Sequence, residues 1–253
     1  MESELKFEIG NSKDMGGTTF AERRQEPVIA MRRTVGCQPI LISDFDFRIF
    51  PCFSFAPCSH YDSAMSMYQN ALSSALATIE SLAGLEENLL RAAGFVRTCL
   101  LGGNKLLVAG NGGSAADGMD FSTEYTCRFN GDRKPFPAIN LAADGTLLAA
   151  IGNDYAFEEV FARQVWAFGK PGDVLVVYST SGKSPNILRA LDEAKARGLS
   201  SIAFLGRDGG PAAGRATVDL IVRAEITARI QEAHKFLAHC ICEHVDGDLK
   251  KVS

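Results

Sequence analysis

Five short runs of apolar residues, each separated from the next by helical stretches or loops, constrain this chain more than any other feature. Strands buried on both faces of a sheet consist almost entirely of apolar residues, and strands joined by helices run parallel. The runs are residues 105–109, 136–142, 173–178, 201–205 and 218–222. The sequence therefore predicts an α/β fold: a three-layer sandwich with a five-stranded parallel sheet flanked by helices.

Apolar residues at helical spacing mark the segments around these runs. The predicted helices cover residues 66–83, 86–101, 114–129, 145–151, 157–168, 185–197 and 228–250. Residues 1–61 show neither a helical nor a strand period. We expect them to form an irregular extension, which is either a disordered arm, a strand-like arm docked on the body, or the product of an upstream start codon. Residues 62–253 are expected to form one domain.

Composition narrows the class of protein. The net charge of −4 gives no electrostatic footprint for nucleic acid. Seven cysteines at irregular spacing, with no CxxC pair, favour reduced thiols over a disulfide framework. The N-terminus lacks the pattern of a signal peptide, and no apolar run reaches the roughly 18 residues of a membrane helix. We therefore expect a cytoplasmic protein that binds neither nucleic acid nor a membrane.

Two loops after predicted strands favour phosphate binding. Residues 110–114 read GNGGS, and residues 179–184 read STSGKS ahead of Pro185. Glycine-rich turns and hydroxyl groups at a helix start present N–H and O–H donors to an anion. The alternatives are a tight turn with Ser114 as a helix N-cap, and a merely polar loop. Neither loop matches a dinucleotide or Walker motif, so no nucleotide cofactor is expected. A third loop, residues 206–210, is less specific and is interpreted as a turn.

Two predicted helices carry candidate acid–base groups. Asp120, Glu124 and Arg128 are spaced to share one face of the helix at 114–129. The alternative is a solvated charged stripe with a Glu124–Arg128 pair. Gln231 and His239 face one way on the last helix, with Lys235 between them, and a polar helix edge would explain them equally. The residues alone thus predict a phosphate-binding α/β domain with unassigned carboxylate and histidine groups.

These motifs resemble the phosphoheptose isomerases, a family with the sugar isomerase (SIS) fold. The resemblance spans about residues 66–250 and rests on GNGGSAAD at 110–117, EYTCR at 124–128, IGNDY at 151–155, STSGKS at 179–184, GRDGG at 206–210 and TARIQEAH at 227–234, with His239 beyond. It implies an SIS-type sandwich, a homotetramer, and conversion of sedoheptulose 7-phosphate to D-glycero-D-manno-heptose 7-phosphate through an enediol.

The resemblance also implies roles for individual residues. Glu124 is expected to be the base that moves a proton between C1 and C2, and His239 its partner acid. The expected substrate-binding residues are Ser114, Ser179, Thr180, Ser181 and Ser184 for the phosphate, Asn111, Asp154 and Gln231 for sugar hydroxyls, Gly112 and Gly113 in the first loop, and Arg128 at the edge of the site.

The resemblance also implies a metal site, and this sequence departs from the family pattern at one of its ligands. Some family members bind Zn²⁺ through a His and a Glu of the first of these helices and a Gln and a His of the last. Here Asp120 stands where many members have the His. A zinc site of Asp120, Glu124, Gln231 and His239 is one expectation, since carboxylates also ligate zinc. Another divalent ion, or no ion, is the alternative.

Two further functions compete with this one. One branch of SIS proteins is non-catalytic and binds the replication initiator DnaA, but that branch lacks the Glu and His pair. Isomerases of other sugar phosphates share the phosphate-binding loops, so the sequence separates them weakly.

Overall fold

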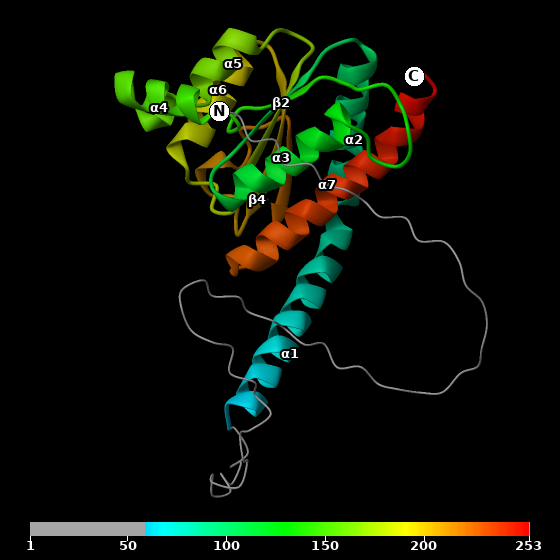
Figure 1. Ribbon diagram of the computed structural model, residues 1–253, viewed down its shortest axis with the longest axis vertical. Helices are drawn as coiled ribbons and strands as arrows, with labels where there is room; N and C mark the ends of the chain where they lie inside the picture. The colour runs from blue at the N-terminus through cyan, green and yellow to red at the C-terminus, as the bar shows by residue number, and fades with distance from the viewer. Residues whose placement is uncertain (1–58, 253) are drawn as a thin grey trace, which may run out of the picture. The chain divides into compact units, whose positions relative to one another are not determined.

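The computed structural model describes residues 59–252, which alternate helices and strands (Figure 1). The helices are α1 (Ser59–Glu80), α2 (Glu86–Leu101), α3 (Gly113–Thr126), α4 (Gly145–Asp154), α5 (Ala162–Phe168), α6 (Pro185–Ala196) and α7 (Thr227–Lys250). Short 3-10 helices are η2 (Ser81–Leu85), η3 (Phe157–Glu159) and η4 (Gly210–Ala212). The strands are β1 (Leu106–Gly110), β2 (Ala138–Asn140), β3 (Val174–Ser179), β4 (Ser200–Gly206) and β5 (Val218–Val222).

The predicted extension, residues 1–61, lies outside the described residues except for its last three, which belong to α1. Three of the seven cysteines, Cys37, Cys52 and Cys58, also lie there. The four cysteines of the described part, Cys99, Cys127, Cys240 and Cys242, are free thiols.

The sheet has the order β2-β1-β3-β4-β5, and every neighbouring pair is parallel. This confirms the predicted five-stranded parallel sheet. Gly110 at the end of β1 pairs with Tyr178 of β3, and Ser179 pairs with Leu205 of β4. The loops that follow these three strands therefore leave the same edge of the sheet side by side.

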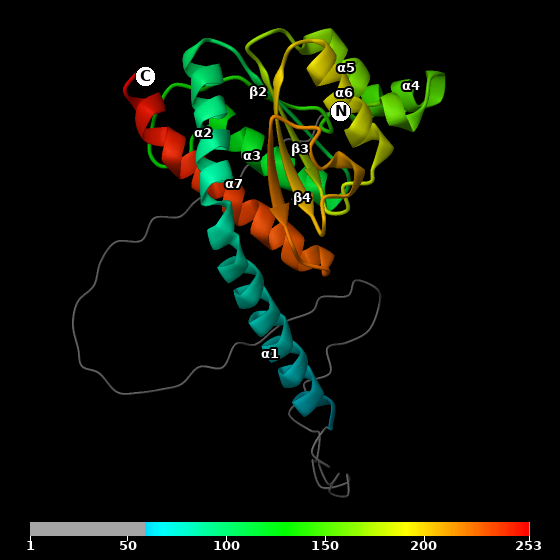
Figure 2. The same cartoon turned by 180° about the vertical axis from the view of Figure 1, so that it is seen from behind.

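Helices cover both faces of the sheet, which confirms the three-layer sandwich (Figures 1 and 2). Alternate residues of a strand point to opposite faces. In β1, Leu106 and Val108 join one buried cluster with residues of α2, α3 and α7. Leu107 and Ala109 join the other cluster, with residues of α4, α5 and α6. The layer of α2, α3 and α7 carries the candidate acid–base groups.

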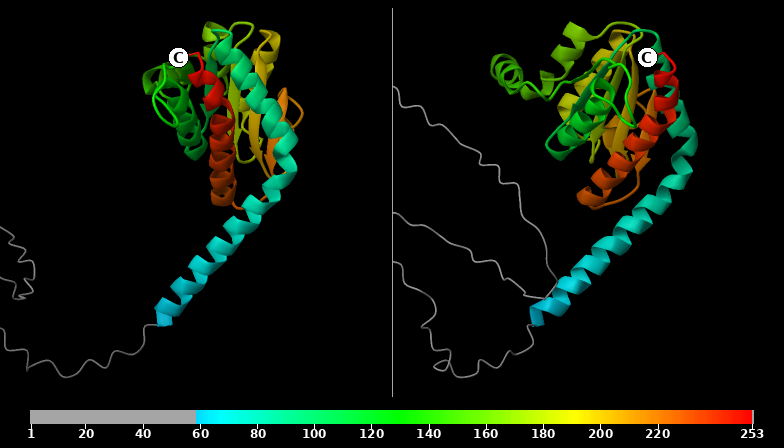
Figure 3. Two further views of the ribbon diagram at one scale, coloured as in Figure 1. Left: turned by 90° about the vertical axis from the view of Figure 1, so that its right-hand side faces the viewer. Right: turned by 45° about the vertical axis from the view of Figure 1, so that its right-hand side comes forward.

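The helix α1 extends past the sandwich (Figure 3). Four large apolar side chains on it are exposed: Met67, Tyr68, Leu72 and Leu76. Within residues 59–252, no helix combines the length and apolar character that crossing a bilayer demands.

Candidate functional site

The loop after β1 turns directly into α3. Gly112 is the N-cap of α3 and has a φ of 53°, a value that glycine adopts without strain. The helix begins at Gly113, so Ser114 lies inside the first turn and is only 5% exposed. Ser114 is thus not the N-cap, contrary to that alternative. The N–H groups of residues 114–116 donate to the carbonyl oxygens of Asn111 and Gly112. Among the described residues, the backbone donors left at this sheet edge are therefore those of Gly112 and Gly113, beside the buried Ser114 hydroxyl.

The loop after β3 folds around its own hydroxyl groups. The buried Ser179 hydroxyl accepts a hydrogen bond of 3.0 Å from the N–H of Gly182. The Ser181 hydroxyl accepts one of 3.2 Å from the N–H two residues on. Ser184 and Pro185 occupy the predicted N-cap and first position of α6, but the Ser184 side chain makes no capping bond. Its hydroxyl is left available to a ligand.

These two loops are joined by a pairing of Asn111 with Asn186, a residue that the sequence did not mark as part of the site. Asn111 and Asn186, in the first turn of α6, exchange hydrogen bonds of 3.0 and 2.8 Å through their side chains. Asn186 is 1% exposed. Each amide group can still make further bonds. The expected phosphate loops therefore form one rigid unit.

The loop at residues 206–210 packs against the loop at residues 179–184. Gly182 has a φ of 62°, and a Cβ there would overlap the carbonyl oxygen of Gly209. Its own carbonyl accepts a 3.1 Å hydrogen bond from the N–H of Ala212 in η4. The loop at 206–210 forms a turn, as expected, closed by a hydrogen bond of 2.9 Å from the Gly209 N–H to the Gly206 carbonyl, and it also packs against residues 179–184.

The helices α3 and α7 lie side by side, and their contacts follow the two helices in the same order. Near the start of α3, the Gln231 amide packs against Gly113. One turn further along α7, the Lys235 ammonium lies 2.7 Å from the Asp120 carboxylate. After another turn, Nε2 of His239 lies 3.4 Å from the same carboxylate. This register brings the polar residues of α7 against the acidic face of α3.

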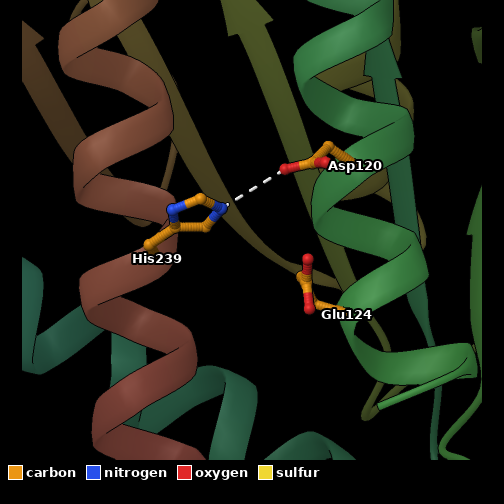
Figure 4. Close-up of side chains that lie close together, drawn as sticks. All are labelled: Asp120, Glu124 and His239. Atoms are coloured by element: carbon orange, nitrogen blue, oxygen red, sulfur yellow. Dashed lines mark hydrogen bonds and ion pairs between the residues drawn. The ribbon is translucent and has the colours of Figure 1, made fainter. Parts of the chain in front are cut away.

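Asp120, Glu124 and His239 form a compact half-buried group (Figure 4). One donor atom from each of the three side chains lies within 4.8 Å of the other two. The shared face predicted for Asp120 and Glu124 is therefore observed, and His239 points at both from α7. Two carboxylates and an imidazole at this separation could hold a metal ion. The same groups could also exchange protons with a ligand.

The surroundings of Asp120 and Glu124 shift the pKa values of the two carboxyl groups in opposite directions. Partial burial acts to raise the pKa of Asp120, but the hydrogen bond and charge of Lys235, together with His239, hold it below its ordinary value. Burial raises the pKa of Glu124, and the charge of Asp120 raises it further against the opposing effects of His239, Lys235 and Arg133. Asp120 thus stays ionised, while Glu124 is the carboxylate better suited to take up and release a proton.

A buried arginine fixes the backbone of Glu124. The Arg133 guanidinium is 8% exposed and donates to the carbonyl oxygens of Glu124 and Tyr125, the latter at 3.1 Å. It also lies 3.3 Å from Asp246 of α7. Arg133 could not be predicted from the sequence, because its ion-pair partner is 113 residues away and no local pattern marks the pair.

Arg128 and Asp154, two of the expected site residues, do not lie beside Asp120, Glu124 and His239 of the same chain. Arg128 was predicted on the face of Asp120 and Glu124, but α3 ends at Thr126, two residues before it. Arg128 is exposed, and among the described residues no ion pair joins it to Glu124. Asp154 ends α4, which packs mainly against η3 in the opposite layer of the sandwich.

A hollow of about 520 Å³ runs along the exposed side of α3. Gly112 lines it at the phosphate-loop end, and Asp117, Asp120 and Lys235 line it further along. Its size suits a small polar ligand.

Comparisons with known proteins point to one family. Residues 67–206 match the SIS domain family. The phosphoheptose isomerase of Shewanella baltica is 43% identical over 174 residues, which are 68% of this chain and 88% of that protein. The structure of phosphoheptose isomerase from Neisseria gonorrhoeae superposes with a TM-score of 0.69 at 38% identity, covering 73% of this chain and 99% of that one. The structure of a phosphoheptose isomerase from Francisella tularensis gives 0.68 at 34% identity, covering 75% and 99%.

Proposed function

This chain belongs to the phosphoheptose isomerase family of SIS-domain proteins, and from that membership we propose that it isomerises sedoheptulose 7-phosphate to D-glycero-D-manno-heptose 7-phosphate. The observation that carries the proposal is the placement of Glu124 and His239 against one another, across the α3–α7 contact (Figure 4). A carboxylate base beside a second proton carrier is what aldose–ketose exchange requires.

The reaction is a balanced internal transfer. Glu124 removes a proton from C1 of the ketose, the C–H electron pair forms the C1–C2 double bond, and the carbonyl electrons move to the oxygen on C2. His239 gives that oxygen a proton, which completes the enediol. Glu124 then returns its proton to C2, His239 takes the proton of the C1 hydroxyl, and the C1 carbonyl forms. C1 is oxidised as C2 is reduced, so no redox cofactor takes part.

The phosphate would be held by the two loops at the sheet edge. Hydroxyl groups of the second loop and the start of α3 supply donors suited to a phosphate monoester. The proposed phosphate ligands are Ser114, Ser179, Thr180, Ser181 and Ser184, with the backbone of Gly112 and Gly113. Asn111 and Gln231 lie next to this unit and are proposed to contact sugar hydroxyls.

The proposed contributions of Asp154 and Arg128 need a second subunit, because neither is placed at the site of its own chain. We propose a homotetramer in which a neighbouring copy completes each site. The exposed apolar side chains of α1 support such an assembly, since a run of this kind on one helix is typical of a contact surface. Light scattering on the purified protein tests the oligomeric state. The free thiols of the described cysteines support a cytoplasmic location.

The fit of a zinc ion is poor although the donor types are suitable. Asp120, Glu124 and His239 offer two carboxylates and an imidazole. The Lys235 ammonium, however, already lies 2.7 Å from the Asp120 carboxylate. A divalent ion would have to enter beside a fixed positive charge. No step of the mechanism above is therefore assigned to a metal.

An isomerase assay with a matched control tests the function. Sedoheptulose 7-phosphate is incubated with the wild type, with Glu124→Gln, and with Glu87→Gln, which changes an exposed glutamate of α2. We expect aldose phosphate from the wild type and Glu87→Gln, and at least a hundredfold less from Glu124→Gln. No product from the wild type, with activity on a pentose or hexose phosphate, would point to another sugar. No product from any sugar, together with a stable complex with DnaA, would favour the non-catalytic branch.

A further inference from the structure

Lys235 carries the only permanent positive charge among the described residues that line the hollow beside α3. Its ammonium lies 2.7 Å from Oδ2 of Asp120. Its charge also acts on Asp117 and Glu124, the two other carboxylates on this side of α3. The mechanism described above leaves this lysine without a task.

The charges around Lys235 are those of a cation site. Asp117, Asp120 and Glu124 follow one another along α3, and Oδ2 of Asp117 is buried with no hydrogen-bond partner among the described residues. Carboxylates gathered in this way need a nearby positive charge to remain ionised together. In this chain the compensating charge belongs to the protein. A divalent ion bound to Asp120 would have to displace the ammonium or sit a few ångströms from it.

We propose that the Lys235 ammonium takes the place of a metal ion in this site, holding Asp120 and donating a hydrogen bond to the substrate oxygen on which negative charge develops. This inference rests on the proposed isomerase function. Lys235 then takes part in the reaction, and its ion pair with Asp120 keeps a metal ion out of the site.

The chemistry of the side chain fits the role. An ammonium group has three N–H donors, and the contact with Asp120 uses one. The Lys235 side chain is 39% exposed toward the hollow, so a ligand there can reach the other donors. When Glu124 takes the C1 proton, the carbonyl electrons move to the oxygen on C2. Lys235 stabilises that charge until His239 protonates the oxygen, and Lys235 keeps its own protons throughout.

An ordinary surface ion pair makes different predictions. Exposed pairs contribute little to stability, and removing one partner changes neither turnover nor metal affinity. A donor aimed at a developing oxyanion is worth on the order of a hundredfold to a thousandfold in kcat. The two accounts therefore separate in two measurements, of which only one depends on activity.

The first measurement is zinc affinity. Chelator-treated wild type, Lys235→Met, the double variant Lys235→Met/Asp120→Asn and the control Lys195→Met, which changes an exposed lysine of α6, are titrated with Zn²⁺ by calorimetry. We expect Lys235→Met to bind Zn²⁺ at least tenfold more tightly than the wild type and the control. The gain should disappear in the double variant. Equal affinities in the wild type and Lys235→Met overturn the proposal.

The second measurement is turnover after chelation. We expect the wild type to keep its kcat, Lys235→Met to lose at least a hundredfold in kcat with a smaller change in KM, and Lys235→Arg to keep more activity than Lys235→Met. Wild-type turnover that chelation abolishes and zinc restores contradicts the proposal, as does a Lys235→Met variant with the wild-type kcat. Absence of turnover in the wild type refutes the isomerase function itself, and the zinc titration still decides whether Lys235 excludes the metal.

Discussion

His234 lies fully buried on α7, with its ring edge-on to the rings of Tyr178 and Phe204. Burial lowers its pKa from 6.5 to about 4, and the backbone of Leu205 opposes this shift only in part. The unfolded chain therefore binds a proton that the folded chain rejects between about pH 6.5 and pH 4. The stabilising contribution of the neutral ring is complete above pH 6.5 and is lost as the pH falls through this window.

The size of the effect follows from the two pKa values. A shift of this size corresponds to about 3 kcal/mol when the pH lies below both values, and about 2 kcal/mol of it is lost between pH 7.5 and pH 5. Replacing His234 by Leu removes the titrating group. We expect the free energy of unfolding of the wild type to fall by about 2 kcal/mol more than that of His234→Leu over this range.

Urea unfolding at a fixed protein concentration, at pH 7.5 and pH 5, measures the difference. His244→Gln, which changes an exposed histidine of the same helix, should keep the wild-type pH dependence. If His234→Leu folds poorly, an NMR titration of the His234 ring replaces it, and the ring should stay neutral at pH 5. Equal losses of stability in the wild type and His234→Leu, or a ring that protonates near pH 6.5, would refute the reasoning.

Three further results are expected. Arg133→Met should lower the free energy of unfolding by about 3 kcal/mol, because the buried Asp246 keeps only its ion pair with Lys250 and buried backbone carbonyl groups lose their donor, and should lower kcat by freeing the backbone of Glu124; urea unfolding and kinetics measure both. Gly182→Ala should lower the free energy of unfolding by at least about 1 kcal/mol, because alanine is strained at this positive φ, and should raise KM for the sugar phosphate more than tenfold. Unchanged kinetics would contradict the role of this loop. The acid limb of the kcat/KM profile should lie at a higher pH than for an exposed glutamate, because the Glu124 base is lost as the pH falls through its raised pKa. Asp120→Asn should move this limb to lower pH, because it removes a charge that raises the pKa of Glu124.

The fold could be predicted because its signals are local. The strands are mostly apolar runs, so the sequence predicts β5 with its observed bounds and the others within about two residues at either end. The end of α3 was placed three residues too late. Cys127 stops the helix without the glycine or proline that usually marks such an end. That error put Arg128 on the wrong face.

Only the site contacts within one helix could be predicted from the sequence. Helical spacing correctly joined Asp120 to Glu124, since residues four apart share a face. The partner of Lys235 depends on how α3 and α7 lie against one another, and no spacing along one helix contains that register. The pairing of Asn111 with Asn186 spans 75 residues in the same way. Contacts of this kind are set by packing of the whole sandwich.

The most direct test of the central claim is solvent exchange at the carbon that Glu124 is proposed to deprotonate. Sedoheptulose 7-phosphate is incubated in D₂O with the wild type or Glu124→Gln, and the recovered ketose phosphate is examined by NMR for deuterium at C1. Glu124 is only partly buried, so its carboxyl proton can exchange with solvent while the enediol is bound. The account therefore predicts deuterium at C1 with the wild type and at least a hundredfold slower incorporation with Glu124→Gln. Exchange and turnover that survive in Glu124→Gln at the wild-type rate would contradict it.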